Sequence, residues 1–473
     1  MWLIGGFYML RALRTEAKPI LRLAVPIILG QLGQMMMPLA DAAMVGRLGV
    51  VPLAAVAFGN LIVWVPMIMG FGLCVAVHVL VASAHGEGHR EEAGEVLRHG
   101  IAMAAAYGVI CAVALHFGLN WLSLIPRVDP AVIDASKPYI AWMGWSIVPM
   151  LAMTVVKNYC ESLNRPWLAL GVLGVCIVLN VGFNFVLIYG NFGVPALGVA
   201  GAGLGTLLAR SAGFVIALGL VWRNAGLRPE WRAGAFGRLA AARLGRLLAL
   251  GGPSAAQILF EVSLFNFATL LCGMISTVTM AAHQIALNVA SVAYMGPLGI
   301  SMAAGIRVSQ AMGGGRYGEA RRIAVTSLAL SLGMMVVYVG AVLATRTALP
   351  ALFLRADAPQ AQAVFALAAT LLAWAASFAV FDGVQITTLG VLRGMHDVRV
   401  PTALLFTGYW AVSAPLAWYL GMRLNYGGPG VWAGLLTGLI VVAGLLVGRL
   451  VTMQNRLKAG EKEKPQITPM SAD

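Results

Sequence analysis

The sequence has 473 residues, of which 60% are hydrophobic and 11% are charged, and its formal net charge is +14. Soluble chains carry about 25% charged residues, so this composition excludes an ordinary soluble protein and indicates a chain that lies in a lipid bilayer. The basic residues are scattered between apolar runs rather than gathered on one face, which favours membrane lipid over nucleic acid as their partner.

Twelve apolar segments follow one another along the chain, each long enough to cross a hydrocarbon core of about 30 Å as a helix. Most Lys and Arg residues fall in alternate connections between these segments, so the positive-inside rule places both termini in the cytoplasm. The sequence therefore predicts an all-α, multi-pass protein of a bacterial inner membrane. The predicted helices cover residues 20–44, 52–83, 97–119, 138–160, 167–189, 200–222, 246–272, 282–309, 322–345, 360–392, 401–421 and 430–452.

An internal repeat relates the two halves of the chain. At a constant offset of 227 residues, Pro26 matches Pro253 and Gly72 matches Gly299. Shared order across a whole half predicts two pseudo-symmetric lobes of six helices. We expect an N-terminal lobe over 1–222, a cytoplasmic linker over 223–245, a C-terminal lobe over 246–452 and a cytoplasmic tail over 453–473. Because each half has an even number of helices, both share one orientation, and transporters of this kind bind substrate between the halves.

Asp41 is the first of three carboxylates that fall within apolar segments. An ionised carboxylate at the bilayer centre costs about 2.5–3.5 kcal/mol, so it is rare unless it faces water, a partner or an ion. Asp41 shares one helix face with Gln31 and Gln34, which indicates a polar lumen. The alternative is a solvated carboxylate at the helix mouth that pairs with Arg47.

Glu261 and Asp382 are the other two carboxylates, and they lie deeper in their apolar segments. Glu261 aligns with Gln257, and Asp382 is followed by Gln385 one turn later. Two carboxylates in a dry cavity can hold a hard cation such as Na⁺ through their oxygens, or share a proton, since like charges raise each other's pKa. The residue pattern alone leaves both ions open, and it also leaves Glu261 open as a structural carboxylate bonded to a neighbouring helix.

Further polar residues share helix faces and either line a cavity or bond between helices. Lys157 and Glu161 are four residues apart and are expected to form an interfacial salt bridge, while His78 and His283 are expected to pack or bridge between helices. The predicted substrate cavity comprises Gln34, Asp41, Asn180, Asn184, Gln257, Gln284, Asn288 and Gln385.

Enzyme motifs are missing from the sequence, which has no HExxH, GxSxG or GxxxxGK[ST] pattern. The sequence therefore gives no motif support for a zinc protease, for a hydrolase with a nucleophile elbow or for a P-loop ATPase pump. An enzyme whose catalytic pair lies outside known motifs stays an alternative. We expect a transporter rather than an enzyme, with no cofactor apart from a coupling ion.

Four runs resemble the multidrug and toxic compound extrusion (MATE) family in its NorM-like branch: PLADAAMVGRLG (38–49), LFEVSLF (259–265), the long run 281–315 that begins AAHQIALN, and LRGMHD (392–397). The resemblance covers residues 18 to 452. It implies a V-shaped pair of six-helix lobes, alternating access, and exchange of small organic cations such as drugs and dyes for Na⁺ or H⁺. We expect such a transporter to act as a monomer.

The resemblance also implies roles for particular residues. The family's acidic residues fall on Asp41, Glu261 and Asp382, and in the NorM-like branch the last two belong to a cation site in the C-terminal lobe. Other branches place a second acid on the fifth helix, where this chain has Asn180 and Asn184. This departure favours Na⁺ over H⁺. A lipid-linked oligosaccharide flippase of the same superfamily is the alternative function, and it is expected to carry a cationic cavity.

Overall fold

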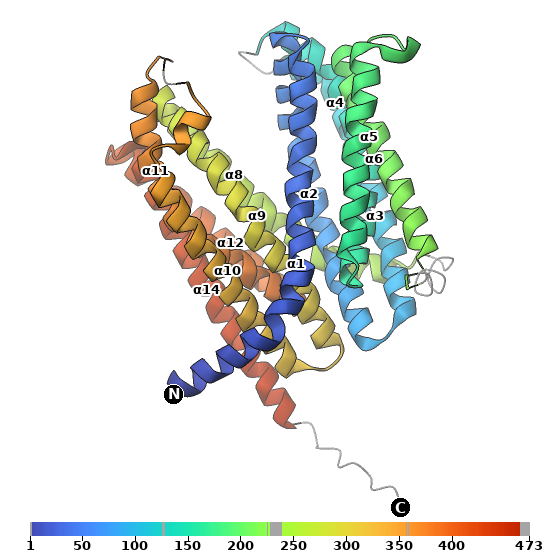
Figure 1. Cartoon of the computed structure of the whole chain (residues 1–473), viewed down its shortest axis with the longest axis vertical. Coiled ribbons are helices and arrows are strands. Elements are labelled where there is room, and N and C mark those ends of the chain that lie inside the picture. The colour runs from blue at the N-terminus through green and yellow to red at the C-terminus, as the bar shows by residue number, and fades with distance from the viewer. Residues whose placement is uncertain are drawn as a thin grey trace, which may run out of the picture. The chain divides into compact units, whose positions relative to one another are not determined.

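The structure is a computed structural model that describes residues 2–124, 128–224, 226–227, 239–355, 357 and 359–463. All regular elements in these residues are helical, and twelve of them are long and apolar enough to cross a membrane (Figure 1). The predicted all-α fold with twelve spans is therefore confirmed. Residues 225 and 228–238 of the expected linker, and 464–473 of the expected tail, lie outside the described residues.

The helices extend beyond the apolar windows at several ends because polar residues continue the same helical turns. The first six spans are α1 (Trp2–Gly46), α2 (Val50–Glu87), α3 (Arg90–Gly118), α4 (Pro130–Ser162), α5 (Pro166–Tyr189) and α6 (Gly198–Arg223). The second six are α8 (Ala241–Ile275), α9 (Thr277–Gly313), α10 (Tyr317–Thr345), α11 (Ala361–Gly394), an eleventh span, and α14 (Gly427–Glu463). The eleventh span joins α12 (Arg399–Phe406) and α13 (Ala414–Trp418) through a π-helical stretch, Thr407–Ser413, and ends in another, Tyr419–Arg423.

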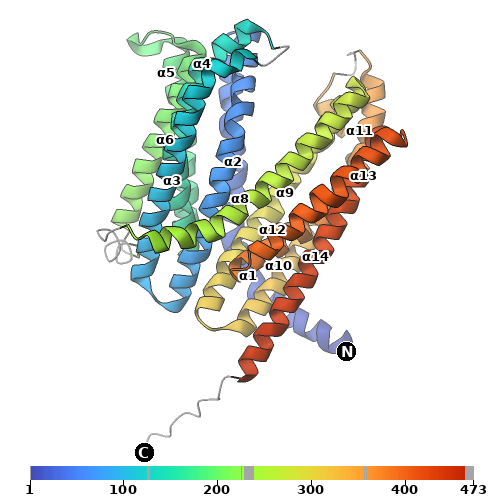
Figure 2. The ribbon, with the colours of Figure 1, turned by 180° about the vertical axis from the view of Figure 1, so that it is seen from behind.

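The chain forms two compact units, which we describe separately. One unit contains Leu21–Asn266, and the other contains Met1–Ile20 together with Phe267–Asp473. In the first unit α4 packs on α2, α3 and α6, and α5 packs on α6 (Figure 2). In the second unit α11 packs on α9, α10 and α14. Helices α1 and α8 each begin in one unit and end in the other, so neither unit is built from one sequence half alone.

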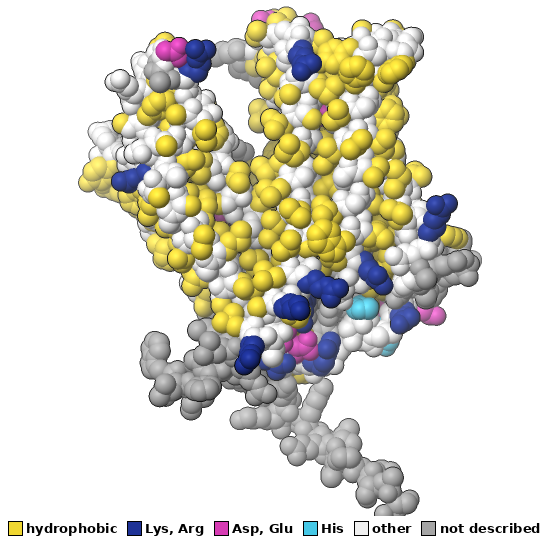
Figure 3. Space-filling model, viewed as in Figure 1, with side chains coloured by type: hydrophobic (Ala, Val, Ile, Leu, Met, Phe, Trp, Pro, Cys, Tyr) yellow, Lys and Arg dark blue, Asp and Glu magenta, His cyan; other side chains and the backbone are white. Residues whose placement is uncertain are grey.

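Hydrophobic side chains cover the outward faces of the helices, as a lipid-facing surface requires. Figure 3 shows them spread over α1 and α5, while Lys and Arg gather near helix ends. Large apolar residues that are exposed on these helices include Leu29, Val178, Val181 and Phe185. The face is therefore suited to acyl chains rather than to water.

The beginning of α1 is fixed within its unit by a buried acid. Glu16 is 6% exposed, and its carboxylate lies 3.0 Å from Nη2 of Arg307 and 3.4 Å from Nε of Arg322. In the other unit the beginning of α8 is fixed in the corresponding way, because Arg243 pairs with Glu95 of α3.

These two ion pairs occupy equivalent positions in the repeat. At the offset of 227, Glu16 corresponds to Arg243 and Glu95 corresponds to Arg322. The two halves therefore keep the same interaction with its charges exchanged. This equivalence in three dimensions is independent support for the repeat that the glycine and proline matches predict.

Candidate functional site

A stripe of small residues on α6 lets α5 approach it closely. Gly201, Gly205, Ala209 and Gly213 recur every four residues, so they lie on one helix face. An added Cβ at Gly201 would meet the backbone oxygen of Leu187, and one at Gly205 would collide with Oδ1 of Asn184. The sequence of α6 therefore creates the space in which polar side chains of α5 are enclosed.

Asp41 enters this space from α1. Its side chain is buried, with 2% of the residue exposed, and Oδ1 accepts a hydrogen bond of 2.5 Å from Nδ2 of Asn184. Oγ1 of Thr206 lies 3.2 Å from the other carboxylate oxygen, and Nδ2 of Asn180 donates to the same hydroxyl at 3.1 Å. The structure thus brings Asp41, Asn180 and Asn184 together. The expected alternative partner, Arg47, is exposed.

Two features of this cluster leave oxygen atoms available. The single hydroxyl hydrogen of Thr206 serves either Asp41 or the backbone oxygen of Ala202, which is 2.9 Å away. Oδ1 of Asn184 is buried without a hydrogen-bond partner among the described residues. Buried polar atoms are seldom left unpaired, so this oxygen needs an explanation. Rotation of the Asn184 amide would turn the oxygen toward Asp41.

Arg210 is a fifth member of the cluster, and the residue pattern alone did not find its role. It follows Thr206 by one turn of α6, is 6% exposed, and donates from Nη1 to Oγ of Ser146 at 2.6 Å. Its charge also interacts with that of Asp41. An arginine inside an apolar span is expensive and rare, which is the sequence signal that could have identified it. The buried charges of Asp41 and Arg210 sum to zero.

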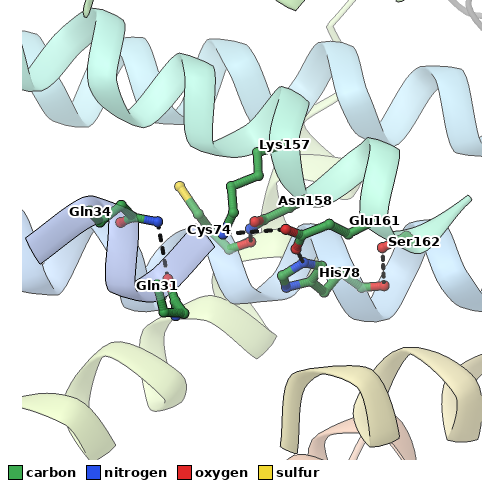
Figure 4. A network of polar contacts seen from close by, with 8 residues as sticks. All are labelled: Gln31, Gln34, Cys74, His78, Lys157, Asn158, Glu161 and Ser162. Carbon is green, nitrogen blue, oxygen red and sulfur yellow. Dashed lines mark hydrogen bonds and ion pairs between the residues drawn. The ribbon is translucent and has the colours of Figure 1, made fainter. Parts of the chain in front are cut away.

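The remaining predicted residues of the unit Leu21–Asn266 lie on α1 and α8. Nε2 of Gln34 donates to Oε1 of Gln31 at 3.0 Å (Figure 4). Gln257 is buried and Glu261 is partly buried, both on α8.

The other predicted residues belong to the second unit. Asp382 is partly buried on α11, and Gln385 is buried and accepts a hydrogen bond of 2.7 Å from the hydroxyl of Tyr409. On α9, Nε2 of Gln284 lies 3.3 Å from Oδ1 of Asn288. Since Glu261 and Asp382 fall in different units, their common cation site stays a prediction.

The geometry of the Asp41 cluster suits a hard cation or a proton. Carboxylate, amide, hydroxyl and backbone carbonyl oxygens are the ligands that hard cations prefer. In the described ranges no sulfur or imidazole ligand joins these oxygens through a hydrogen bond to Asp41. A soft metal is therefore a poor match for the donor atoms.

A family model described as MatE matches residues 26–186 and 253–419 of this chain. Relatives named probable multidrug resistance protein NorM include one from Bradyrhizobium diazoefficiens, 36% identical over 94% of this chain and 95% of its own length. Another, from Mesorhizobium japonicum, is 34% identical over 92% of this chain and 94% of its own length.

Solved structures agree in fold. A eukaryotic MATE transporter superposes with a TM-score of 0.82 at 20% identity, covering 95% of this chain and 99% of that chain. A MATE transporter from Vibrio cholerae gives 0.82 at 20% identity, with coverage of 95% and 98%. The matched residues of the family model include the helices that carry Asp41, Asn180 and Asn184.

Proposed function

Since this chain belongs to the MatE family of multidrug efflux transporters, we propose that it is a secondary active antiporter that exports organic cations. Export is coupled to entry of Na⁺ or H⁺ by alternating access. The chain works in the bacterial inner membrane with both termini in the cytoplasm. The relatives named multidrug resistance proteins support the substrate class, because they match this chain over nearly its whole length.

The buried cluster around Asp41 carries the proposal of ion coupling. A carboxylate that is 2% exposed, beside an unpaired amide oxygen of Asn184, has the features of a site for a small cation. The coupling ion is bound there by Asp41, Asn180, Asn184 and Thr206. When a proton is the ion, it binds Asp41, and the amides and the hydroxyl hold the carboxyl in place.

The charge of Arg210 supports a monovalent and exchangeable ion. Asp41 and Arg210 together carry no net charge, so an added Na⁺ or proton leaves one buried positive charge, whereas a divalent ion leaves two. At an effective dielectric constant of about 20, the repulsion between Arg210 and the added cation amounts to a few kcal/mol at short range. This repulsion weakens binding of the cation without preventing it. An ion held in this way can be released in each cycle.

Glu261 and Asp382 remain proposed cation ligands, supported by the family resemblance of the runs that contain them. Acidic groups in a low-dielectric environment favour positively charged substrates. The lipid-linked oligosaccharide flippase, which is expected to need an available cationic group, has less support. Arg210 already bonds to Ser146 and balances the charge of Asp41.

Proteoliposomes test the proposal directly. Efflux of a fluorescent organic cation is measured with a Na⁺ gradient and a H⁺ gradient imposed separately. We expect one gradient to drive efflux in the wild type and Asp41→Asn to abolish the coupling. Asp134→Asn is the matched control, because Asp134 is an exposed acid on α4 that pairs with Lys137, and it should transport normally.

The outcomes separate the alternatives. Gradient-independent movement of a labelled lipid without dye efflux would favour the flippase. Coupled efflux that survives in Asp41→Asn would remove Asp41 from the mechanism and leave Glu261 and Asp382 as the coupling acids.

A further inference from the structure

A second group of titratable side chains is buried between α2 and α4 of the unit Leu21–Asn266. Figure 4 shows His78 of α2 facing Glu161 of α4, with Lys157 approaching the same carboxylate. Nε2 of His78 lies 2.8 Å from Oε2 of Glu161, and Nζ of Lys157 lies 3.5 Å from Oε1. The side chains of His78 and Glu161 are 7% and 2% exposed, and that of Lys157 is 14% exposed.

The backbone around this triad is held by further hydrogen bonds between the same two helices. Nδ2 of Asn158 donates to the backbone oxygen of Cys74 at 2.9 Å, and Oγ of Ser162 donates to the backbone oxygen of His78 at 3.1 Å (Figure 4). On α4 the two donors lie on either side of Glu161, and on α2 the acceptors are Cys74 and His78 itself. The triad therefore sits in a fixed frame rather than on a loose surface.

The charged groups that interact with His78 are Glu161 and Lys157, both from α4. The thiol of Cys160 interacts with Glu161, and that of Cys74 with Lys157. Helix α5, which also packs on α4, carries no Asp, Glu, His, Lys or Arg.

Three titratable groups of the other neighbouring helices have partners of their own. On α3, Glu95 pairs with Arg243, and Nε2 of His99 accepts a hydrogen bond from the backbone of Ala240. On α6, Arg210 donates to Ser146. Among the charged groups, Glu161 and Lys157 are therefore the two that act on His78, in addition to the burial of the site.

The hydrogen-bonding roles follow from the chemistry of the three groups. A carboxylate only accepts and an ammonium only donates, so Glu161 accepts from both Lys157 and Nε2–H of His78. With His78 neutral, the triad has no net charge. Histidine is the side chain whose ordinary charge change falls between pH 5 and 8, and an added proton here is paired with a carboxylate at 2.8 Å.

We propose that His78, Glu161 and Lys157 form a proton-binding site that is distinct from the Asp41 cluster. The ligand is a single proton taken up on His78, and Glu161 is the counter-charge that holds it. Helix α4 carries both Glu161 and Ser146, which bonds to Arg210 of the Asp41 cluster. These two residues are 15 positions apart on one helix, or about 22 Å. The sites are therefore separate and joined by one helix.

The test is a histidine titration of the whole purified protein in detergent. The chain has 7 histidines, and labelling their imidazole carbons gives one nuclear magnetic resonance signal for each. His78→Gln identifies the signal of His78 and keeps a donor for Glu161. We expect this signal to titrate between pH 5 and 8 in the wild type.

Two further variants test the counter-charge by opposite shifts of the same signal, so the assignment does not depend on His78→Gln alone. Glu161→Gln should move the inflection to lower pH by at least one unit, a tenfold loss of proton affinity, because the paired negative charge is gone. Lys157→Met should move it to higher pH, because a repelling charge is gone. The signal of His283, which contacts Trp432 and Thr269, is the internal control and should not respond.

A His78 signal that does not titrate between pH 5 and 8 would overturn the proposal. So would an inflection that ignores Glu161→Gln. Because the titration needs neither a drug nor a gradient, its result is independent of the transport function proposed above.

Discussion

Gly205→Ala is a small change outside the charged groups that should nevertheless weaken the ion site. Gly205 lies on α6 at the point where α5 packs against this helix. Because glycine has no side chain, there is room for the Asn184 amide. An added Cβ would collide with Oδ1 of Asn184 and would lie 3.2 Å from the backbone nitrogen of the same residue. The amide must therefore move, and with it the hydrogen bond of 2.5 Å to Asp41.

The size of the effect follows from the ligand that is displaced when Na⁺ is the coupling ion. The amide of Asn184 is one of the proposed Na⁺ ligands, and a hydrogen bond to a charged group, which sets the scale for such a polar contact, contributes about 1.5–3 kcal/mol. Since about 1.4 kcal/mol is a factor of ten in affinity, Na⁺ binding should weaken by roughly tenfold to a hundredfold. Alanine is favoured over glycine within a helix by about 1 kcal/mol, which offsets part of the packing strain in the folded protein. We therefore expect a functional loss with little loss of thermal stability.

The assay is a binding titration of a fluorescent organic cation in detergent over a range of Na⁺ concentrations and pH values. The Na⁺ concentration that gives half of its effect on drug affinity should rise in Gly205→Ala. Gly219→Ala is the matched control, because Gly219 lies on the same helix and an added Cβ there meets open space. Equal ion dependence in Gly205→Ala and the wild type would refute the reasoning, as would an equal loss in both variants.

Three more predictions follow from the same structure. Glu261→Gln and Asp382→Asn should fold but lose coupled efflux in proteoliposomes, and wild-type rates would remove these acids from the mechanism. Raising Na⁺, or lowering the pH if protons couple, should lower equilibrium drug affinity, because by linkage the ion weakens drug binding by the same factor by which the drug weakens ion binding. An ion-independent drug affinity would contradict this. Glu16→Arg should lower the melting temperature, and adding Arg322→Glu should restore part of it by reversing the ion pair, whereas additive losses would argue against the pair.

The membrane-spanning architecture could be predicted from the amino-acid sequence. Apolar runs of bilayer length and the distribution of Lys and Arg are properties of each segment and its flanks, so they can be read without knowing which helices touch. The repeat could also be found from the sequence, because finding it needs only a comparison of residue types at a constant offset. The MatE family was also identifiable at this level, since its motifs are continuous runs such as residues 38–49 and 281–315.

The helix faces were partly predictable as well. Asn180 and Asn184 share a face of α5 because they are four residues apart, and Lys157 and Glu161 form the expected pair on α4 for the same reason. What this periodicity cannot give is the partner helix. Glu161 also contacts His78 of α2, which is 83 residues away in the chain.

The contacts between polar residues of different helices became known from the packing of those helices. Asp41, Asn184 and Arg210 come from three helices, and their proximity depends on the small-residue stripe of α6 that admits α5. Each of these side chains is expensive to bury alone, and each becomes acceptable only beside the others. A charge-balanced buried cluster is a property of packed helices, because hydrogen bonds and opposite charges act over a few ångströms in space whatever their separation in the chain.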